Sequence, residues 1–411
     1  MNKKYFILSI ILLFFCIGFT NITSPISCIQ EKMGCAGGWK EIGEGSASGD
    51  GISDNSTMCG SPSLVINNSG NPVIGWESGD SLGALIHVTQ WNGTGWEAIG
   101  VNLSAGSSGV NLHPSLRINK SGNPVIAWDG ENSENYEIYL KQWNGSTWEQ
   151  LGGSASDGGI GNGQYPSLTI NNSGNPVVAW YNENTNIYLK QWNDSSWEEL
   201  GGSASNGGIG NGYFYGISLA INSLGYPIVV WGTGSEIYLK QWNGSNWEGL
   251  GGSSSGGGIG SGYTDTESLA INNAGYPVVA WINSTSEGKR IYLKQWNGTT
   301  WEELGGSASD KGVSGSIGEI VGISLDINDV GNPVVVWGYN INSYNREIYL
   351  KQWNGNEWEE LDNSASEGGI SNSSGLSMSP SIAINSSGNP VVAWSEESDL
   401  YSSIYIKQYV P

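Results

Sequence analysis

The chain has 411 residues, of which 13% are charged, and its formal net charge is −22 at pH 7. This acidic balance argues against nucleic acid as a partner, because its phosphates would repel the protein, and equally against docking on anionic lipid. The 63 glycines and 20 tryptophans are typical of Gly-rich turns between aromatic strands, and so of all-β proteins.

The N-terminus has the pattern of a secretory signal peptide. Lys3 and Lys4 precede an apolar stretch that ends near Phe19, and polar residues follow at once. We predict a signal peptide at 1–24 and a linker at 25–38. The mature chain is then secreted or held at the cell surface, without a membrane span. An uncleaved anchor is the alternative.

Four cysteines occur, all in the first part of the chain: Cys16, Cys28, Cys35 and Cys59. The first lies inside the predicted signal peptide, so three cysteines remain in the mature chain. Because three is an odd number, at least one of them cannot take part in a disulfide within the chain. The disulfide pairing of Cys28, Cys35 and Cys59 stays open. A lipid anchor at Cys28 is a less favoured alternative, because the residues before it make a poor lipobox.

Three short segments recur along the chain with a common period. The segment Gly-Asn-Pro-Val-Val-Ala-Trp, or a near copy, occurs seven times, and its final tryptophans lie 50 to 57 residues apart. Segments similar to Ile-Tyr-Leu-Lys-Gln-Trp and Trp-Glu-Glu-Leu-Gly-Gly recur with the same period, and the three segments together contain every tryptophan. Such repetition predicts one large repeat domain.

Each repeat contains four short runs with the composition of β-strands. In the third repeat they are 167–171, 176–180, 187–192 and 197–200, with apolar and polar residues alternating in the third run. Four antiparallel strands in each of seven repeats predict an all-β fold, a seven-bladed β-propeller of four-stranded antiparallel blades at 39–411.

The phase of the repeat predicts how the ring closes. The chain enters its first repeat at the fourth run and leaves its last repeat at the third run. The N-terminal strand therefore pairs with the C-terminal blade, which places Trp39 opposite Tyr409 and Glu41 opposite Lys407. This pairing removes an open sheet edge.

The repeat resembles the kelch and Asp-box (sialidase-type) propeller repeats of secreted proteins. The kelch likeness lies in the repeat length, in Tyr188 and in 197–200, but the pair Gly201-Gly202 follows the fourth run instead of the second. The Asp-box likeness lies in the hairpin 144–148, without the usual spacing. Both resemblances imply a propeller over the whole repeat region, and neither implies an activity.

One face of the predicted propeller carries loops that vary from blade to blade, namely those from the second to the third strand and from the fourth strand to the next blade. Loops on a rigid scaffold are where function concentrates. Aromatic rings beside carboxylates and amides suit sugars and also protein partners. The predicted ligand-binding residues are Asp129, Tyr136, Tyr181, Asn182, Tyr213, Tyr215, Tyr263, Asp265, Tyr339, Tyr344 and Tyr401.

The Gly-rich segment 154–163 recurs between blades and is interpreted as a crossover turn. A Ca²⁺ loop is the alternative, but Asp157 becomes Asn206 and then Gly256 in later copies. We therefore expect no cofactor and no other metal site. The Asn-x-Ser/Thr glycosylation sequons, such as the one at Asn144, begin hairpin turns. The preference of such turns for asparagine explains why this residue recurs there.

Catalytic signals are weak. His87 and His113 have no neighbouring cysteine and no zinc motif, and His113 lacks a recognisable nucleophile. Arg117, Arg290 and Arg346 occupy unlike repeat positions, so a sialidase-like triad of arginines is not expected. We predict no catalytic residues and a monomeric, non-catalytic binding propeller for a glycan or an extracellular protein. The alternatives are a glycan-active hydrolase or lyase, for which paired carboxylates remain available, and a structural envelope protein.

Overall fold

A computed structural model describes residues 37–411, except 54–56, 81–82, 102, 106–108, 133–134, 157, 213–215, 262, 310, 316–317 and 399–400. The side chains of residues 80 and 263–266 are also not described. The chain divides into two units, Met1–Gly37 and Gly38–Pro411, and only the second is described below. The predicted signal peptide, most of the linker, Cys28 and Cys35 lie outside the described residues. Within those residues, no helix has the length and apolar character needed to cross a bilayer.

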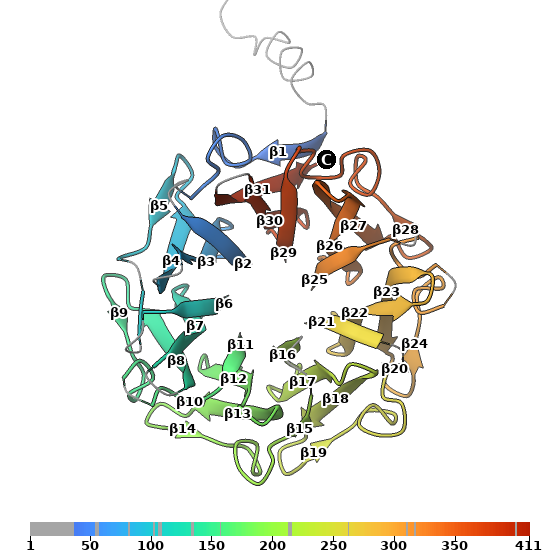
Figure 1. Ribbon diagram of the computed structural model, residues 1–411. Coiled ribbons are helices and arrows are strands. Elements are labelled where there is room, and N and C mark those ends of the chain that lie inside the picture. Colours follow the sequence, from blue (N-terminus) through green and yellow to red (C-terminus); the bar gives the residue numbers. More distant parts are fainter. Residues whose placement is uncertain are drawn as a thin grey trace, which may run out of the picture. The chain divides into compact units, whose positions relative to one another are not determined.

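The second unit is built from antiparallel groups of four strands that lie around a centre, with one strand of each group facing inward (Figure 1). The innermost strands are β2 (Met58–Ile66), β6 (Asn111–Ile118), β11 (Gln164–Ile170), β16 (Ile217–Ile221), β21 (Tyr263–Ile271), β25 (Ile320–Ile327) and β29 (Leu376–Ile384). The second strands are β3 (Pro72–Asp80), β7 (Pro124–Glu131), β12 (Pro176–Tyr181), β17 (Pro227–Gly232), β22 (Pro277–Thr285), β26 (Pro333–Asn342) and β30 (Pro390–Glu397).

The outer half of each group is a hairpin. The third strands are β4 (Gly83–Trp91), β8 (Tyr136–Trp143), β13 (Asn186–Trp192), β18 (Glu236–Trp242), β23 (Gly288–Trp296), β27 (Asn345–Trp353) and β31 (Ser402–Val410). The outermost strands are β1 (Gly38–Glu41), β5 (Trp96–Ala98), β9 (Trp148–Glu149), β14 (Trp197–Glu198), β19 (Trp247–Glu248), β24 (Trp301–Glu302) and β28 (Trp358–Glu359). The short strands β10 (Gly161–Asn162), β15 (Gly210–Asn211) and β20 (Gly260–Ser261) pair with third strands.

These pairings give three five-stranded sheets, one four-stranded sheet and one twelve-stranded sheet. Within the largest sheet, neighbouring groups are joined by single parallel bridges, Met58 with Ser402 and Arg346 with Leu376. The described residues contain strands and turns and no helix. The all-β prediction, with antiparallel sheets of a propeller type, is confirmed.

Local chemistry explains the hairpin turns. The Asn144 side-chain oxygen accepts hydrogen bonds from the backbone N–H groups of Ser146 (3.0 Å) and Thr147 (2.9 Å), and its amide donates to Glu149 (3.3 Å). Such a turn uses the asparagine side chain in place of a backbone group. The same bonds recur at Asn243 and its counterparts, so the sequon asparagines are engaged in the fold.

The Gly-rich crossover segments have a repeated structural role as well. The hydroxyl of the fully buried Ser154 donates to the Leu140 carbonyl (2.7 Å) and accepts from the Leu151 N–H (3.0 Å). The equivalent serines, Ser203, Ser253, Ser307 and Ser364, make the same two bonds. The alternative of a Ca²⁺ loop depends on Asp157, which lies outside the described residues.

The hydrophobic core is divided among neighbouring groups, so that each cluster is shared by two of them. One cluster joins Val125 and Ile138 of one group to Val178 and Trp180 of the next. Another joins Ile404 of the last group to residues of the first group, including Trp76. Burial of such apolar surface is the main force that holds adjacent groups together.

Two belts of hydrogen bonds also connect each group to the next. In the inner belt, a serine hydroxyl on one innermost strand accepts the N–H of the residue that directly follows the equivalent serine in the neighbouring repeat, at 3.0 to 3.3 Å. The acceptors are Ser63, Ser115, Ser167, Ser218, Ser268, Ser324 and Ser381, and the bond of Ser381 returns to Leu64 on the first innermost strand. In the outer belt, tryptophan indoles donate to carbonyls of the preceding group, as Trp39 does to Leu361 (3.0 Å).

The N-terminal strand β1 pairs antiparallel with the C-terminal strand β31. Its register places Trp39 opposite Tyr409, with ring centroids 5.7 Å apart, and Glu41 opposite Lys407. The Lys407 ammonium donates to the Ile370 carbonyl (2.8 Å). Glu41 and Lys407 are both described and form no ion pair with each other, although the charge of Glu41 partly opposes the lowering of the Lys407 pKa by burial.

Candidate active site

The innermost strands contain β-bulges near one end, where the register with the second strand shifts. The shifts lie between Gly60 and Ser63, between Leu112 and Ser115, and at the corresponding points of other groups. The bulges hold non-glycine residues at positive φ. These residues are Ser61 (48°), His113 (51°), Tyr165 (56°) and Ser379 (49°). Such backbone is costly for L-residues, and bulges redirect side chains beside active sites.

These bulge residues line one cavity of about 370 Å³, here called the mouth cavity. Its remaining lining comes from prolines and serines of the innermost strands and from Gly216, Ile217, Glu267, Gly322 and Ile323. The size is in the range of small-molecule sites. The strained bulges therefore bring a histidine, a tyrosine and two serines to one space, which Glu267 also lines.

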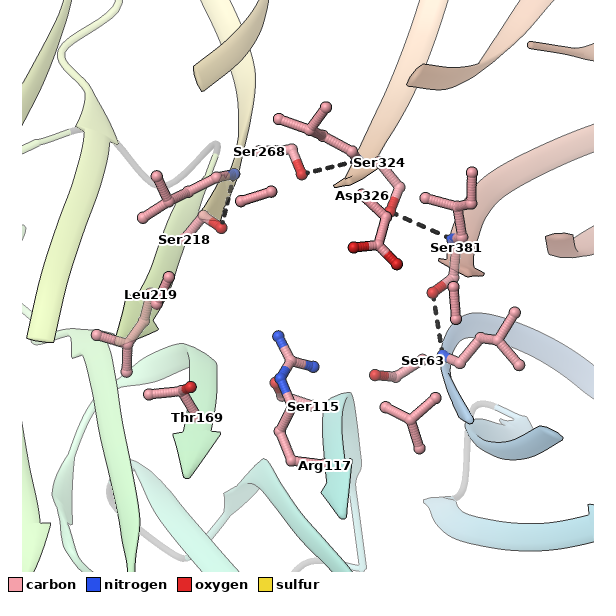
Figure 2. A pocket seen from close by; sticks show the side chains of 18 of the residues that line it. Ser63, Ser115, Arg117, Thr169, Ser218, Leu219, Ser268, Ser324, Asp326 and Ser381 are labelled. Carbon is pink, nitrogen blue, oxygen red and sulfur yellow. Dashed lines mark hydrogen bonds between the residues drawn. The ribbon is translucent and has the colours of Figure 1, made fainter. Parts of the chain in front are cut away.

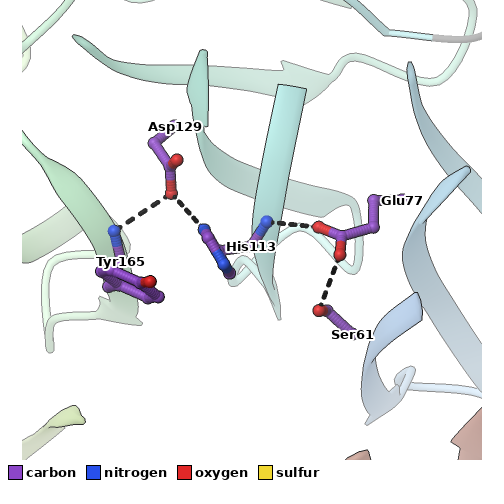
Figure 3. A network of polar contacts seen from close by, with 5 residues as sticks. All are labelled: Ser61, Glu77, His113, Asp129 and Tyr165. Carbon is purple, nitrogen blue, oxygen red and sulfur yellow. Dashed lines mark hydrogen bonds and ion pairs between the residues drawn. The ribbon is translucent and has the colours of Figure 1, made fainter. Parts of the chain in front are cut away.

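A network of polar contacts fixes the histidine (Figure 3). One oxygen of Asp129, which is completely buried, accepts from His113 Nδ1 (2.9 Å) and from the Tyr165 N–H (3.0 Å). Glu77 accepts from the His113 N–H (2.6 Å) and from the Ser61 hydroxyl (2.9 Å). The His113 ring also packs on the Tyr165 ring, with centroids 4.2 Å apart. Because Nδ1 faces Asp129, Nε2 is the nitrogen left for a water or a ligand.

The surroundings of His113 favour its charged form. Burial alone would lower its pKa, but the hydrogen bond and charge of Asp129, together with the charge of Glu77, outweigh burial, and the pKa is raised above its ordinary value of 6.5. The imidazole is 29% exposed, so it stays in contact with the mouth cavity.

This pKa shift predicts a pH-dependent contribution to stability. A raised folded-state pKa means that the contribution is fully present below the unfolded pKa, near 6.5, and is lost as pH rises through the folded pKa. We expect His113→Gln to lower the free energy of unfolding more at pH 5.5 than at pH 8.5. Urea unfolding at the two pH values measures this difference, and an equal loss at both would contradict the assignment.

Glu267 is the second titratable group of the mouth cavity. Its side chain is 5% exposed, and neither carboxyl oxygen has a hydrogen bond of ordinary geometry among the described residues. Burial raises its pKa to about 8, against the opposing effect of the backbone N–H groups of Gly232 and of Glu267 itself. At neutral pH this carboxyl group is therefore mostly protonated, and it can donate a proton.

Close packing explains why Glu267 is desolvated. A Cβ atom at Gly216 would lie 2.9 Å from a Glu267 oxygen, so the glycine leaves room for the carboxyl group. The hydroxyl of Tyr181 donates to the Gly216 carbonyl. Burial raises the pKa of Tyr181 well above 10, and the charge of Glu267 acts in the same direction. Tyr165 packs against the cluster that contains Tyr181, so these residues form a continuous wall from His113 to Glu267.

A second cavity adjoins the mouth cavity. It measures about 510 Å³, shares Ser61 and Ser379 with the mouth cavity, and has a more apolar lining that includes Met58, Leu112 and Met378. Glu77 also lines it. A ligand in the mouth cavity could thus extend sideways past Ser61 over apolar surface.

The structure brings only some of the predicted ligand-binding residues to the mouth. Asp129 and Tyr181 belong to its supporting network. The pKa of Tyr136 is raised mainly by burial, then by the charge of Glu131, and then by the charge of Asp129. Asn182 is buried and caps its own turn by accepting from the Asn184 and Asn186 N–H groups.

The other predicted residues lie elsewhere or outside the described part. Tyr339 stacks on Tyr349 at 5.1 Å, Tyr344 is 86% exposed and Tyr401 is 42% exposed. None of these three is among the residues that line the mouth cavity. Tyr213 and Tyr215 are outside the described residues, as are the side chains of Tyr263 and Asp265.

The residues that sequence reasoning left out of the predicted site are Ser61, Glu77, His113, Tyr165 and Glu267. A signal for three of them exists, because four of the innermost strands contain Pro-Ser while the residue before Pro changes chemically. That residue is Ser61 before Pro62, His113 before Pro114 and Tyr165 before Pro166.

The three arginines do not converge on one site. Arg290 pairs with Glu287 (3.1 Å), and Arg346 donates to Asn340 (2.5 Å). Arg117 lines a different cavity at the centre. The expectation that these arginines form no sialidase-like triad agrees with this arrangement.

No known protein-family profile matches the chain, and no curated protein matches it. Solved structures do match. An α-L-arabinofuranosidase from Fusarium graminearum, in complex with an iminosugar inhibitor, is 10% identical; the match covers 86% of this chain and 93% of that one, with a TM-score of 0.50. An α-L-arabinanase from Penicillium chrysogenum, complexed with arabinobiose, is 12% identical over 86% and 93%, with a TM-score of 0.48. A sialidase from Streptococcus pneumoniae is 11% identical over 87% and 69%, with a TM-score of 0.42.

These comparisons correct the functional prediction. One of the solved structures that share the fold is named as an enzyme, an α-L-arabinofuranosidase. The mouth cavity, moreover, holds a buried carboxyl group whose pKa is about 8, which is a feature of catalytic acids. The expectation of a non-catalytic binding module is therefore wrong. That expectation rested on the lack of recognisable catalytic motifs in the sequence.

Proposed function

We propose that the second unit is a seven-bladed β-propeller closed by its N-terminal strand, with Trp39, Glu41, Lys407 and Tyr409 at the junction. Three observations support closure. The serine belt returns from Ser381 to the first innermost strand, one core cluster joins the last group to the first, and β1 pairs with β31. The kelch and Asp-box likenesses remain resemblances of the repeat.

Closure predicts that the junction is as strong as any other contact between blades. Ser381→Ala removes an acceptor for the Leu64 N–H across the junction, and Ser218→Ala removes the equivalent acceptor for Leu269 inside the ring. Each change leaves an N–H unpaired and should lower the free energy of unfolding by about 1–3 kcal/mol. Denaturant unfolding of both variants measures this. A negligible loss for Ser381→Ala beside a clear loss for Ser218→Ala would show an open ring.

We propose further that the protein is a glycan-active hydrolase whose active site is the mouth cavity. The observation that carries this proposal is that the buried Glu267, whose pKa burial raises to about 8, lines the same cavity as the Asp129-held His113. Glycosidic bonds break when an acid protonates the leaving oxygen while a second group activates water. The fold shared with an arabinofuranosidase adds support to this assignment.

The proposed reaction conserves atoms and protons. Glu267 gives its proton to the glycosidic oxygen as the bond between that oxygen and the anomeric carbon breaks. The oxygen of a water forms the new bond to the anomeric carbon, and His113 Nε2 takes the proton of that water. Asp129 holds the Nδ1–H tautomer that leaves the Nε2 lone pair available. The reaction needs neutral His113 and protonated Glu267, so the rate should fall on both sides of a pH optimum.

The charges favour a neutral glycan as the substrate. The chain carries a net charge of −22, and Glu77 and Asp129 lie beside the mouth cavity, bonded to His113. Carboxylated or sulfated sugars would meet repulsion there, and the arginines that could offset it are elsewhere. The ring of Tyr165 offers an apolar surface to the C–H face of a sugar. Export, guided by the predicted signal peptide, is part of the same proposal.

The test is the release of reducing ends by the purified full-length mature chain from a panel of neutral and anionic glycans. The proposal expects cleavage of one or more neutral glycans, arabinose-containing ones among them, and at least a tenfold preference over anionic ones. No cleavage of any glycan, or a preference for sialylated or sulfated substrates, would contradict it.

A further inference from the structure

The centre of the second unit contains another cavity, which the proposed reaction does not use. This central chamber has a volume of about 470 Å³ and is lined by the innermost strands. It shares Ser63 and Ser115 with the mouth cavity, so the two spaces meet at the inner serine belt. The residue two positions after each of the seven belt serines also lines the chamber. These positions hold Val65, Arg117, Thr169, Ala220, Ala270, Asp326 and Ala383.

Two of these positions carry opposite charges, while the others are small or apolar. Arg117 and Asp326 point into the chamber from different strands, β6 and β25 (Figure 2). They do not form an ion pair, although both side chains are described. Each still feels the field of the other, because the charge of Asp326 opposes the lowering of the Arg117 pKa by burial.

Neither charged group is fully satisfied by the protein. Among the described residues, the Arg117 guanidinium donates one hydrogen bond, to the Leu116 carbonyl (2.7 Å), although it has five N–H groups. The Asp326 carboxylate accepts one backbone N–H on each oxygen, from Ile327 (2.8 Å) and from Ile384 (2.9 Å). A carboxylate can accept more than these two bonds. Burying charges with so few partners is costly unless something else pairs with them.

We propose that the central chamber binds a small zwitterion, of the class of free amino acids, with its carboxylate on Arg117 and its ammonium group on Asp326. A simple anion at Arg117 would be repelled by Asp326, and a simple cation at Asp326 would be repelled by Arg117. A ligand that carries both charges satisfies both residues. The small side chains of Thr169, Ala220 and Ala270 leave room for the body of the ligand along one wall. This proposal is independent of the proposed glycan hydrolysis.

Isothermal titration of the full-length mature chain tests the proposal directly. The probes are glycine, L-alanine, β-alanine and 4-aminobutyrate, with acetate and methylammonium as single-charge controls. At least one zwitterion should bind with 1:1 stoichiometry and at least tenfold more tightly than either control. Arg117→Gln and Asp326→Asn should each weaken that binding at least tenfold. The matched control Arg290→Gln, at an arginine already paired with Glu287, should leave binding unchanged.

A second variant keeps the test decisive if loss of a charge disturbs folding. Ala220→Leu fills part of the chamber and leaves both charges in place, so it should also abolish binding while Arg290→Gln does not. Two results would overturn the proposal. One is no binding of any zwitterion to the wild-type chain. The other is binding of acetate as tight as that of the zwitterions, with no loss in Asp326→Asn, which would make the chamber an anion site.

Discussion

Glu267→Gln should reduce the kcat for glycan cleavage by about 10²–10⁴-fold, because the amide cannot donate the proton that the leaving oxygen requires. The wild-type rate should fall above pH 8 as Glu267 loses its proton. Any residual activity of the variant should lack this alkaline limb. Steady-state kinetics from pH 5 to pH 10 measure both effects.

The matched control for this experiment is Glu357→Gln. Glu357 is exposed in an outer hairpin turn, where its backbone N–H donates to Asn354. The substitution makes the same chemical change far from the mouth cavity and should leave the rate and the pH profile unchanged. If Glu267→Gln keeps the wild-type rate and the same fall in rate above pH 8, Glu267 is not the proton donor.

The same residue should also govern stability at alkaline pH. The folded-state pKa of Glu267 is about 8, against an ordinary value of 4.5. Between these values the folded state binds more protons than the unfolded state, so the free energy of unfolding falls as pH rises across this window. The accumulated loss is on the order of 5 kcal/mol. Glu267→Gln carries no such penalty, so it should be more stable than the wild type at pH 9 and about equal to it at pH 5.

Urea unfolding at pH 5, 7 and 9 measures this difference without any knowledge of the substrate. The Glu357→Gln variant should follow the wild type at every pH. Parallel stability curves for the wild type and Glu267→Gln would mean that Glu267 titrates as an ordinary carboxyl group.

The fold could be predicted from sequence because its determinants are local and repeated. Pro176 begins β12, and Trp180, four residues later, is buried between groups. The same pattern recurs in every repeat, so each copy supports the others. The register of β1 with β31 followed from the same periodicity. Trp39 begins a run of the fourth type with no run of the third type before it, so its partner is the third-type run at the C-terminus.

The candidate site could be predicted only in part, because its properties arise between strands that are distant in sequence. His113 seemed isolated in the sequence, but the register of β6 with β7 places it beside Asp129, sixteen residues away. The high pKa of Glu267 depends on packing against Gly216 from the preceding repeat. Asp129 was predicted as a ligand-binding residue, and in the structure its carboxylate accepts a hydrogen bond from His113. Exposed aromatics such as Tyr344 were predicted to bind a ligand, and the structure places Tyr344 outside the lining of the mouth cavity.

The protonation state of Glu267 at neutral pH is the central claim, and a titration of this one carboxyl group tests it most directly. Carbon-13 NMR of protein labelled at the glutamate side-chain carboxyl carbon, compared with spectra of Glu267→Gln, isolates its signal. The account predicts a titration midpoint at about 8. A midpoint near the ordinary value of 4.5 would contradict the assignment of Glu267 as the proton donor.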